Sequence, residues 1–583
     1  MKELVEQNLT LAVHRFLAEK GIKPDPMPAI VLDHVKDTRH GDLASNIAMV
    51  LAKPAGMPPR KIAEGVLALL PETPGLDKTE IAGPGFINFF LSKTAHLQII
   101  PQILSQGEQF GRGTSGNHHR VLIEFVSSNP TGPLHIGHGR GAAYGSVLAR
   151  ILDAAGFDVT TEYYVNDAGR QMDILALSVW LRLLQRRDKL AFGFPPNAYQ
   201  GAYIEDIAGG YVLSGGKATT ADPEKLSRIL TLQIEEDKRL DQLIEYAKST
   251  LGSNDYNSLF NYTLAQMLDE IRNDLGEFGV SFNNWFSEKS LLEDGTVAEC
   301  IRRLKDSGDV YEQDGALWFR STNYGDEKDR VVIRENGQAT YFASDIAYHL
   351  NKYERGYDEI IDIWGADHHG YISRVKGAIK ALGHDPDKLT ILMVQFATLY
   401  RGGEKLQMST RSGEFITLRE LRNEAGNDAT RFFYVTRKSE QHLDFDLDLA
   451  KSQSNDNPVY YIQYAHARIA SVFKQLDDRK LSFSKITDPD RLTSLTEPHE
   501  LELIKALSRY GEIICAAAHN REPHMLAFYL RDLANYFHTY YNSCQFLVDD
   551  VNIREARLSL ILATQQVIRN GLGLLGVSAP LEM

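Results

Sequence analysis

"VLIEFVSSNPTGPLHIGHGR", residues 121–140, is the stretch that decides the fold. It begins with an apolar run typical of a buried strand and continues into a helix-like segment that starts near Gly137. Two imidazoles, His135 and His138, stand at this junction with a glycine between them. Residues 159–165 form another run rich in β-branched and aromatic side chains. The order strand–helix–strand predicts the opening of a parallel α/β sheet.

Two later apolar runs predict the rest of this sheet. Residues 359–367 and 389–399 read as strands, and a helix-like segment connects them. The long polar stretch before them, at about 170–335, reads as an insert. From residue 453 onward the pattern becomes almost wholly helical. We therefore expect three domains, with an amphipathic helix and a strand at 83–91 in the first of them: residues 1–112, 113–452 and 453–583.

The junction at the end of the first strand has the residue types that bind a nucleotide phosphate. A helix N-terminus carries unpaired amides and a partial positive charge, and such sheets bind ligands at the carboxyl ends of their strands. Imidazoles placed there can follow a phosphate as its charge grows, and Gly137 leaves room for a flat purine ring. The alternatives are histidines without a function and a metal pair, although no further ligands follow at metal spacing. We expect no metal site.

The composition narrows the class of protein. A net charge of −14 over 583 residues argues against indiscriminate polyanion binding, but it leaves room for a local docking surface. Three scattered cysteines without a CxxC pair indicate a reducing, cytoplasmic compartment. Charged residues interrupt the N-terminal apolar pattern, so we expect an amphipathic helix there rather than a signal peptide. No apolar run approaches the roughly 18 residues of a membrane span, and we expect no membrane association.

Several motifs resemble those of one enzyme family. "PLHIGH" (133–138) resembles the His-Ile-Gly-His motif of class I aminoacyl-tRNA synthetases, and the stretch from Glu124 to His138 resembles its arginyl-tRNA synthetase form. The likeness continues in "YVNDAGRQ" (164–171), "TYFASDIAYHL" (340–350), "GADHHGY" (365–371), "GNDATRFFY" (426–434) and "NDNPVYYIQYAHARI" (455–469). The resemblance implies a Rossmann-like α/β catalytic domain with an insert, an α+β N-terminal domain that holds the tRNA elbow, and an all-helical anticodon-binding domain.

The resemblance also implies a reaction and its substrates. ATP, accompanied by Mg²⁺, would activate L-arginine to arginyl-adenylate, and the arginine would then pass to the 3′ end of tRNA(Arg). His135 and His138 are implied in catalysis, and together with Pro133 and Gly137 they are implied in ATP binding. Nothing in the sequence suggests an obligate dimer, so we expect a monomer.

The second motif of class I enzymes, Lys-Met-Ser-Lys-Ser, is degenerate in this chain. The corresponding stretch is "GGEKLQMSTRSGEF" (402–415). Gln407 and Thr410 replace both lysines. Met408 and Ser409 remain and are expected to contact ATP.

The missing lysines leave two candidates for the cation that neutralises the leaving phosphates, Arg411 and Lys405. Some arginyl enzymes place a compensating lysine just before the first motif, but Gly132 stands at that point here. A non-catalytic tRNA-binding relative would also explain the degenerate motif, although the intact first motif argues against it. A stand-alone nucleotidyltransferase would need neither the N-terminal nor the helical C-terminal region.

Acidic and polar residues gather at the expected strand ends and suit an arginine pocket. A guanidinium pairs bidentately with a planar carboxylate. The resemblance implies that Glu124, Asn129, Tyr341, Asp345 and Asp367 form this pocket. We expect Asp345 to bind the guanidinium, and Glu124 or Asn129 to bind the α-amino end. Each acid could instead cap a helix.

Aromatic residues outside the sheet-forming domain are candidates for tRNA contacts. Tyr460 and Tyr464 lie in a helical segment that interleaves aromatic and basic residues, which can stack unpaired bases. Phe86 and Asn88 are the corresponding candidates in the N-terminal domain. The alternative for each aromatic side chain is a place in the hydrophobic core.

Overall fold

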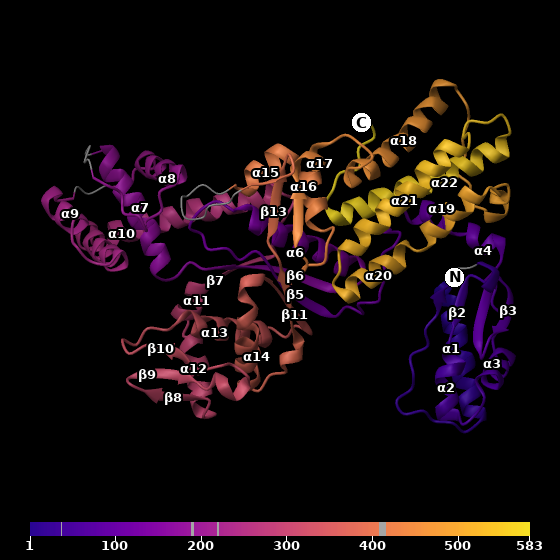
Figure 1. The fold of residues 1–583 in the computed structure, drawn as a ribbon, viewed down its shortest axis with the longest axis horizontal. Helices are drawn as coiled ribbons and strands as arrows, with labels where there is room; N and C mark the ends of the chain where they lie inside the picture. Colours follow the sequence, from indigo (N-terminus) through magenta and orange to yellow (C-terminus); the bar gives the residue numbers. More distant parts are fainter. Residues whose placement is uncertain (36–37, 188–191, 218–220, 407–415) are drawn as a thin grey trace.

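The computed structural model describes residues 1–35, 38–187, 192–217, 221–406 and 416–583, and a five-stranded parallel sheet lies at its centre (Figure 1). The order is β12-β11-β5-β6-β7, with strands β5 (Arg120–Glu124), β6 (Asp158–Val165), β7 (Asn284–Ser287), β11 (Glu359–Gly365) and β12 (Leu389–Val394). β5 pairs with β6 on one side and with β11 on the other. Its carboxyl end therefore lies where the strand order reverses, the usual ligand position in such sheets.

Helix α6 (Ile136–Ala154) follows β5 and is buried along most of its length. Small residues let it lie directly on the sheet: a Cβ at Gly145 would come within 2.3 Å of the Phe125 ring. Its outer face packs against the C-terminal helices, where Tyr144 Oη donates to the carbonyl of Arg521 at 2.6 Å. The fully buried Arg431 donates to Ser146 Oγ at 2.9 Å and to two backbone carbonyls. The predicted β5–α6–β6 unit thus forms the centre of the hydrophobic core.

The stretch 170–335, predicted as one insert, forms two lobes, one before and one after strand β7 in the sequence. The first is helical and has its own hydrophobic core; it contains α7 (Arg170–Arg187), α8 (Ala202–Leu213), α9 (Pro223–Leu230) and α10 (Glu236–Glu277). The second contains α11 (Glu288–Glu293), α12 (Thr296–Asp306), β8 (Val310–Gln313), β9 (Ala316–Phe319) and β10 (Arg330–Ile333). The two lobes extend from the central sheet in different directions (Figure 1).

The run 389–399, predicted as one strand, belongs to two sheets. β12 ends at Val394, and β13 (Ala397–Arg401) pairs with β14 (Glu404–Lys405) and β15 (Leu443–Asp446). The break falls at Gln395, whose carbonyl accepts a hydrogen bond at 2.7 Å from the buried Arg140 and whose amide donates to the carbonyl of Ser439 at 2.9 Å. Between residues 341 and 451 the chain also forms these helices: α13 (Tyr341–Glu354), η4 (Ala366–Tyr371), α14 (Ile372–Ala381), α15 (Leu418–Ala425), α16 (Asn427–Tyr434) and α17 (Leu447–Lys451).

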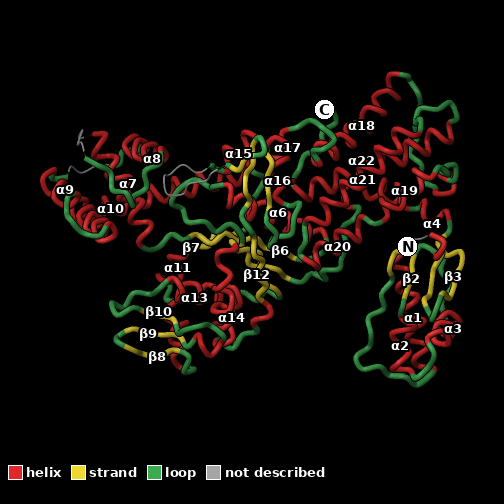
Figure 2. Tube along the Cα trace, in the orientation of Figure 1, coloured by secondary structure: helices red, strands yellow, loops and turns green. Residues whose placement is uncertain are grey.

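Two further regions lie on one side of the sheet-forming domain, the C-terminal helices nearer to the sheet and the N-terminal region against those helices (Figure 2). The N-terminal one packs α1 (Lys2–Glu19), α2 (Ile47–Ala55) and α3 (Pro59–Ala68) on an antiparallel sheet of order β1-β2-β4-β3, with β1 (Asp33–His34), β2 (Leu43–Ser45), β3 (Leu76–Ala82) and β4 (Phe86–Leu91). The C-terminal one contains α18 (Pro458–Asp478), α19 (Pro498–Ser508), α20 (Tyr510–Asn520), α21 (His524–Ser543) and α22 (Val551–Leu575). Helices α4 (Lys93–Leu97) and α5 (Ile99–Gln106), inside the range expected for the N-terminal domain, contribute Leu97, Ile100 and Ile103 to the large central core.

Candidate functional site

A cavity of about 520 Å³ lies at the carboxyl ends of β5 and β11, in front of α6. Its walls come from the signature loop (residues 126–135), the first turn of α6, α13, and the segments that follow β11 and β12. Seven of the residues predicted for ATP and arginine line it together: Asn129, His135, Gly137, His138, Tyr341, Asp345 and Asp367. The lining does not include Pro133, which is half-buried beside the cavity, or Glu124.

The two histidines of the first motif cap α6. The Nδ1 atom of His135 accepts a hydrogen bond from the Gly137 amide at 3.0 Å, and the Nδ1 atom of His138 accepts one from the His135 amide at 3.3 Å. Because each Nδ1 is an acceptor, the proton of each neutral ring is on Nε2. Burial lowers the pKa of both rings, that of His138 to about 3. Both histidines are therefore neutral Nε2–H donors at neutral pH.

Gly137 lies under an aromatic side chain that was not predicted for the site. A Cβ at this position would come within 2.8 Å of the His135 ring and 3.0 Å of the ring of Phe396, so a larger residue does not fit. Phe396 lies in the break between β12 and β13, lines the cavity and is 46% exposed. Phe396 was not predicted for the site because it fell inside the predicted strand 389–399, where an aromatic side chain is expected to pack in the hydrophobic core.

The signature loop is fixed from two sides. The start of α15 pairs with it: the Ile136 amide donates to the carbonyl of Ile416 at 3.2 Å, and the Leu418 amide donates to that of Leu134 at 2.8 Å. On the other side, Tyr203 of the first insert lobe donates to the carbonyl of Thr131 at 2.7 Å. The loop that carries the first histidine is thus held by parts of the chain that lie far apart in sequence.

The second motif falls mostly outside the described residues. Met408, Ser409 and Arg411 lie in the stretch 407–415, which the structure does not describe. Lys405 is described and is exposed in β14. Lys405 does not line the cavity in this arrangement, and the role of Arg411 stays a prediction.

The acidic side of the cavity is centred on Asp345. Its Oδ2 accepts a hydrogen bond from Tyr371 Oη at 2.5 Å. Burial raises the pKa of Asp345, against the hydrogen bond from Tyr371 and the charges of His349 and Lys352. Tyr341, one turn earlier in α13, is 50% exposed at the cavity. Asp367 does not end a strand as predicted, because β11 stops at Gly365 and Asp367 lies exposed in η4.

Glu288 is a second cavity acid that was not predicted from the sequence. It is 4% exposed, and its Oε2 has no hydrogen-bond partner among the residues that the structure describes. Burial raises its pKa to about 7 despite a hydrogen bond from Ser344. Glu288 directly follows β7, so recognition of that short strand would have indicated it by the same argument as for the other strand ends. Other lining residues that were missed are Tyr164 and Gln171, whereas His368 belongs to the stretch 367–369 that was expected to line the pocket.

Glu124 lies beneath the cavity rather than at its surface. Its carboxylate forms an ion pair with the fully buried Lys352 and accepts a hydrogen bond from Ser127 Oγ at 2.8 Å. The backbone turns away immediately afterwards, with φ of 71° at Val126 and 41° at Ser127, values that are strained for residues other than glycine. The expected contact of Glu124 with the α-amino end of a ligand is therefore not available in this arrangement.

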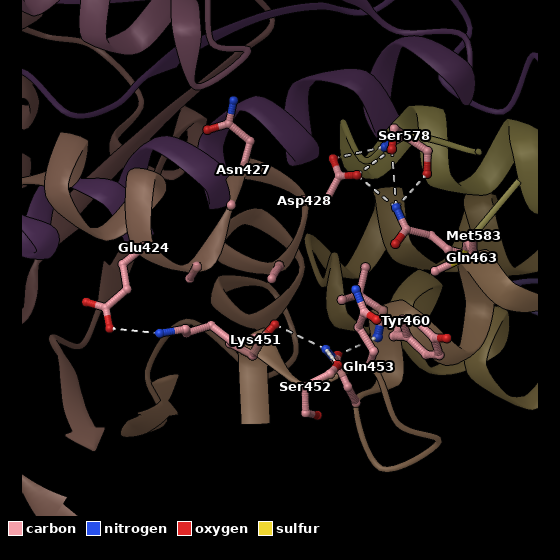
Figure 3. A pocket seen from close by; sticks show the side chains of 16 residues that line it. Glu424, Asn427, Asp428, Lys451, Ser452, Gln453, Tyr460, Gln463, Ser578 and Met583 are labelled. Atoms are coloured by element: carbon pink, nitrogen blue, oxygen red, sulfur yellow. Dashed lines mark hydrogen bonds and ion pairs between the residues drawn. The ribbon is translucent and has the colours of Figure 1, made fainter. Parts of the chain in front are cut away.

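A second, larger cavity of about 790 Å³ lies between α16, α17, α18 and the C-terminal residues (Figure 3). Asp428 accepts hydrogen bonds from Gln463 Nε2 at 2.8 Å and from the Ser578 amide at 3.1 Å, which ties the C-terminal segment to α18. Tyr460 lines this cavity and stacks on Tyr464 with ring centroids 5.9 Å apart. The two cavities share no lining residue.

The candidate tRNA residues differ in exposure. Tyr460 and Tyr464 are partly exposed, and the guanidinium of Arg468 lies 4.5 Å from the Tyr464 ring centre. Phe86, at the start of β4, is 40% exposed. Asn88 in the same strand is only 4% exposed. A buried amide cannot reach a nucleotide in this conformation, so Asn88 is not positioned for the predicted contact.

Neither a metal cluster nor a membrane-spanning helix is found among the described residues. No group of three or more His, Cys, Asp or Glu side chains among them is arranged to hold a metal ion. Within the same ranges, no helix combines the length and the apolar character needed to cross a membrane.

Comparison with known proteins places the chain in one family. Three family models match it: "Arginyl tRNA synthetase N terminal domain" over residues 1–91, "tRNA synthetases class I (R), catalytic domain" over 99–206 and 222–453, and "DALR anticodon binding domain" over 462–583. The arginine–tRNA ligase of Thioalkalivibrio sulfidiphilus is 55% identical over 587 residues, and that of Legionella pneumophila strain Corby is 53% identical over 590; both alignments cover 100% of each chain.

A solved structure confirms the expected fold class. Thermus thermophilus arginyl-tRNA synthetase superposes with a TM-score of 0.72 at 23% identity, covering 100% of both chains. The parallel sheet, the N-terminal domain and the helical C-terminal region agree with the fold that the motifs implied. The chain belongs to the arginine–tRNA ligase family of class I aminoacyl-tRNA synthetases.

Proposed function

We propose that this chain activates L-arginine with ATP in the cavity in front of α6 and transfers the arginine to the 3′ end of tRNA(Arg), releasing pyrophosphate and AMP. Membership of the family implies ATP, arginine and tRNA as substrates. One observation carries the assignment of the site. Two neutral Nε2–H donors at the N-terminus of α6 share a cavity with two carboxylates, the half-buried Asp345 and the buried Glu288.

The α6 end of the cavity is the proposed ATP site. The adenine lies against Gly137 and Phe396, Pro133 stiffens the adjacent loop, and His135 and His138 donate hydrogen bonds to the phosphates. A carboxylate oxygen of arginine attacks the α-phosphorus, a P–O bond forms, and the bond to the pyrophosphate oxygen breaks. Pyrophosphate leaves with the Mg²⁺ that accompanies ATP. Met408 and Ser409 complete the site, and Arg411 or Lys405 supplies the cation.

The opposite end of the cavity is the proposed arginine site. Asp345 and Glu288 accept from the guanidinium, whose fixed fork matches carboxylate oxygens. Binding a cation stabilises the charged form of Glu288 and lowers its pKa from about 7. Asn129 and Asp367 face the α-amino end, and Tyr341 covers the ligand. Glu124 does not contact the ligand; it pairs with Lys352, whose positive charge favours the ionised form of Asp345.

We also propose which residues contact tRNA, and the oligomeric state and the compartment of the enzyme. Tyr460 and Tyr464, at the second cavity, stack on anticodon-loop bases, and Phe86 contacts the tRNA elbow. The stacked tyrosines, with a guanidinium beside one of them, support this assignment. We infer that the enzyme acts as a cytoplasmic monomer.

The test is arginine-dependent exchange of pyrophosphate into ATP, measured with and without tRNA(Arg). We expect exchange only when tRNA is present, as the family resemblance implies. Lysine and ornithine should not support exchange, because they lack the guanidinium fork. No exchange under either condition would favour a non-catalytic tRNA-binding protein. Exchange driven equally by lysine would contradict the assigned pocket.

A further inference from the structure

We propose that His349 is a positioning residue for arginine: a buried imidazolium that holds the backbone of Asp345 and keeps the side chain of that residue ionised. The inference rests on the proposed role of Asp345 as a guanidinium ligand. His349 lies one turn after Asp345 in α13 and does not line the cavity. Its effect on the substrate is therefore exerted through Asp345.

The two hydrogen-bond partners of His349 set its protonation state. Nδ1 lies 2.7 Å from the carbonyl oxygen of Asp345, and Nε2 lies 2.9 Å from Asp362 Oδ2. A backbone carbonyl carries no proton, so Nδ1 must be the donor of the first pair. An ionised Asp362 can only accept, so Nε2 must be the donor of the second. A ring that donates from both nitrogens carries a positive charge.

Asp362 is held in its ionised form. Burial alone would raise its pKa, but the charge of Lys352 and the hydrogen bond from His349 outweigh burial and lower the pKa to about 2. Lys352 Nζ lies 2.7 Å from Asp362 Oδ1 and also pairs with Glu124. The pKa of Lys352 is raised, because these two carboxylates outweigh the effect of burial, so the ammonium stays charged.

With Glu124 and Asp362 both ionised, the buried cluster is electrically neutral when His349 is charged; burial raises the pKa of Glu124, and the charge of Lys352 and the hydrogen bonds from Lys352 and Ser127 oppose this effect. Glu124 and Asp362 contribute two negative charges, and Lys352 contributes one positive charge. An imidazolium brings the sum to zero, whereas a neutral ring would leave one uncompensated negative charge in the interior, which is costly. The ring of His349 also lies edge-on to the aromatic side chains of Tyr348 and Trp364.

The charge of His349 acts on the substrate through Asp345. Burial favours the neutral form of Asp345, and the groups that oppose it are the Tyr371 hydroxyl and the positive charges of His349, Lys352 and His368. Loss of the His349 charge would therefore increase the protonated fraction of Asp345. Loss of the ring would also free the Asp345 carbonyl from a side-chain contact that fixes the first turns of α13. Both effects weaken the binding of a guanidinium.

The protonation state can be measured directly in the unmodified enzyme. Nitrogen-15 NMR of histidine-labelled protein at pH 7.5 should show one ring with both nitrogens protonated. This signal should be missing from the His349→Gln variant, which assigns it. If the signal that disappears in the variant contains one unprotonated nitrogen, the inference is wrong. The measurement does not depend on activity, and it requires only that the unmodified protein is folded.

Steady-state kinetics of arginine-dependent exchange test the positioning role. His349→Gln should raise KM for arginine about 10-fold, with KM for ATP and for tRNA changed by less than about 2-fold. His349→Lys, which retains a charged donor, should recover most of the loss. His384→Gln, a half-buried histidine after α14, is the control and should have no effect. Equal increases in KM for arginine and ATP would contradict the inference.

Asp345→Asn separates this inference from the function on which it rests. If Asp345→Asn leaves KM for arginine unchanged, the proposed arginine site itself is wrong. If that variant raises KM strongly while His349→Gln behaves as the unmodified enzyme, only the role of His349 is wrong.

Discussion

The hydroxyl of Tyr203 lies 2.7 Å from the carbonyl oxygen of Thr131, so the helical insert lobe is hydrogen-bonded to the signature loop. The same hydroxyl stands 3.2 Å from the position that a Cβ at Gly132 would take. Gly132 stands just before the first motif, and a side chain at this position would meet Tyr203. The insert lobe therefore limits the side chain that fits just before the first motif.

Gly132→Ala should lower kcat/KM for ATP about 3- to 10-fold, equivalent to about 1 kcal/mol, because the added methyl displaces Tyr203 or the loop. In the Gly132→Ala/Tyr203→Phe double variant the nearest ring atom would be 3.5 Å away, an ordinary contact. The double variant should therefore be no worse than Tyr203→Phe alone. A double-mutant cycle of pyrophosphate exchange measures this coupling, and strictly additive losses would mean that the two residues act independently.

The hydrogen-bonding pattern of His138 predicts different effects for two amide substitutions. His138→Gln can keep a donor near the Nε2 position, whereas His138→Asn can replace the Nδ1 acceptor but loses the donor toward the cavity. We expect the rate of arginine activation to fall about 10-fold in the Gln variant and about 100- to 1000-fold in the Asn variant. Single-turnover adenylate formation in the presence of tRNA measures this difference. Equal losses would show that capping of α6, rather than donation to phosphate, is the main role.

Glu288→Gln should stabilise the ligand-free protein while impairing its function. The pKa of Glu288 in the folded protein is about 7, above the unfolded value of 4.5, so the folded state binds more protons between these values. The free energy of unfolding therefore decreases as pH rises from about 4.5 to about 7, and the full loss is present above pH 7. Glu288→Gln, which removes this charge, should raise the free energy of unfolding by about 2 to 3 kcal/mol at pH 8 and by almost nothing at pH 4.5.

Urea denaturation at the two pH values measures this effect of Glu288→Gln, and KM for arginine at pH 8 should rise about 100-fold. Glu293→Gln, exposed at the end of the same helix, is the matched control and should change neither quantity. Equal stabilisation at both pH values would mean that ionisation of Glu288 is not the cause.

Local patterns were sufficient to predict the centre of the molecule. The apolar run before His135, the glycine-rich start of α6 and the run 159–165 gave β5, α6 and β6 within a few residues, because each signal lies within the element itself. The one cavity acid on α13 among the described residues, Asp345, followed from the family resemblance. The residues predicted in the stretch 407–415 remain predictions.

Features that depend on distant partners were not predictable. β7 has only four residues, Asn284–Ser287, and is a strand because it pairs with residues 162–165 of β6. Because β7 was not predicted, Glu288 was not recognised as a residue at the carboxyl end of a strand, where site residues were expected. Glu124 was expected to face the ligand because its partner, Lys352, lies 228 positions later and neither segment alone indicates the pair. Likewise, the break after β12 is imposed by Arg140, which a continuous apolar pattern does not reveal.

The close contact between α6 and β5 gives a final prediction about stability. Gly145→Ala would place a methyl 2.3 Å from the ring of Phe125, so the helix must move away from the sheet, and we expect the variant to lose about 2 to 3 kcal/mol of unfolding free energy. Because α6 carries both histidines, kcat for arginine activation should fall as well. Gly573→Ala, in α22, has no atom within 4 Å of the new methyl and should be neutral or stabilising by up to about 1 kcal/mol, since alanine favours a helix interior. Urea denaturation measures both variants. If Gly145→Ala is as stable as Gly573→Ala, the tight packing of α6 on the sheet is not what positions the ATP site.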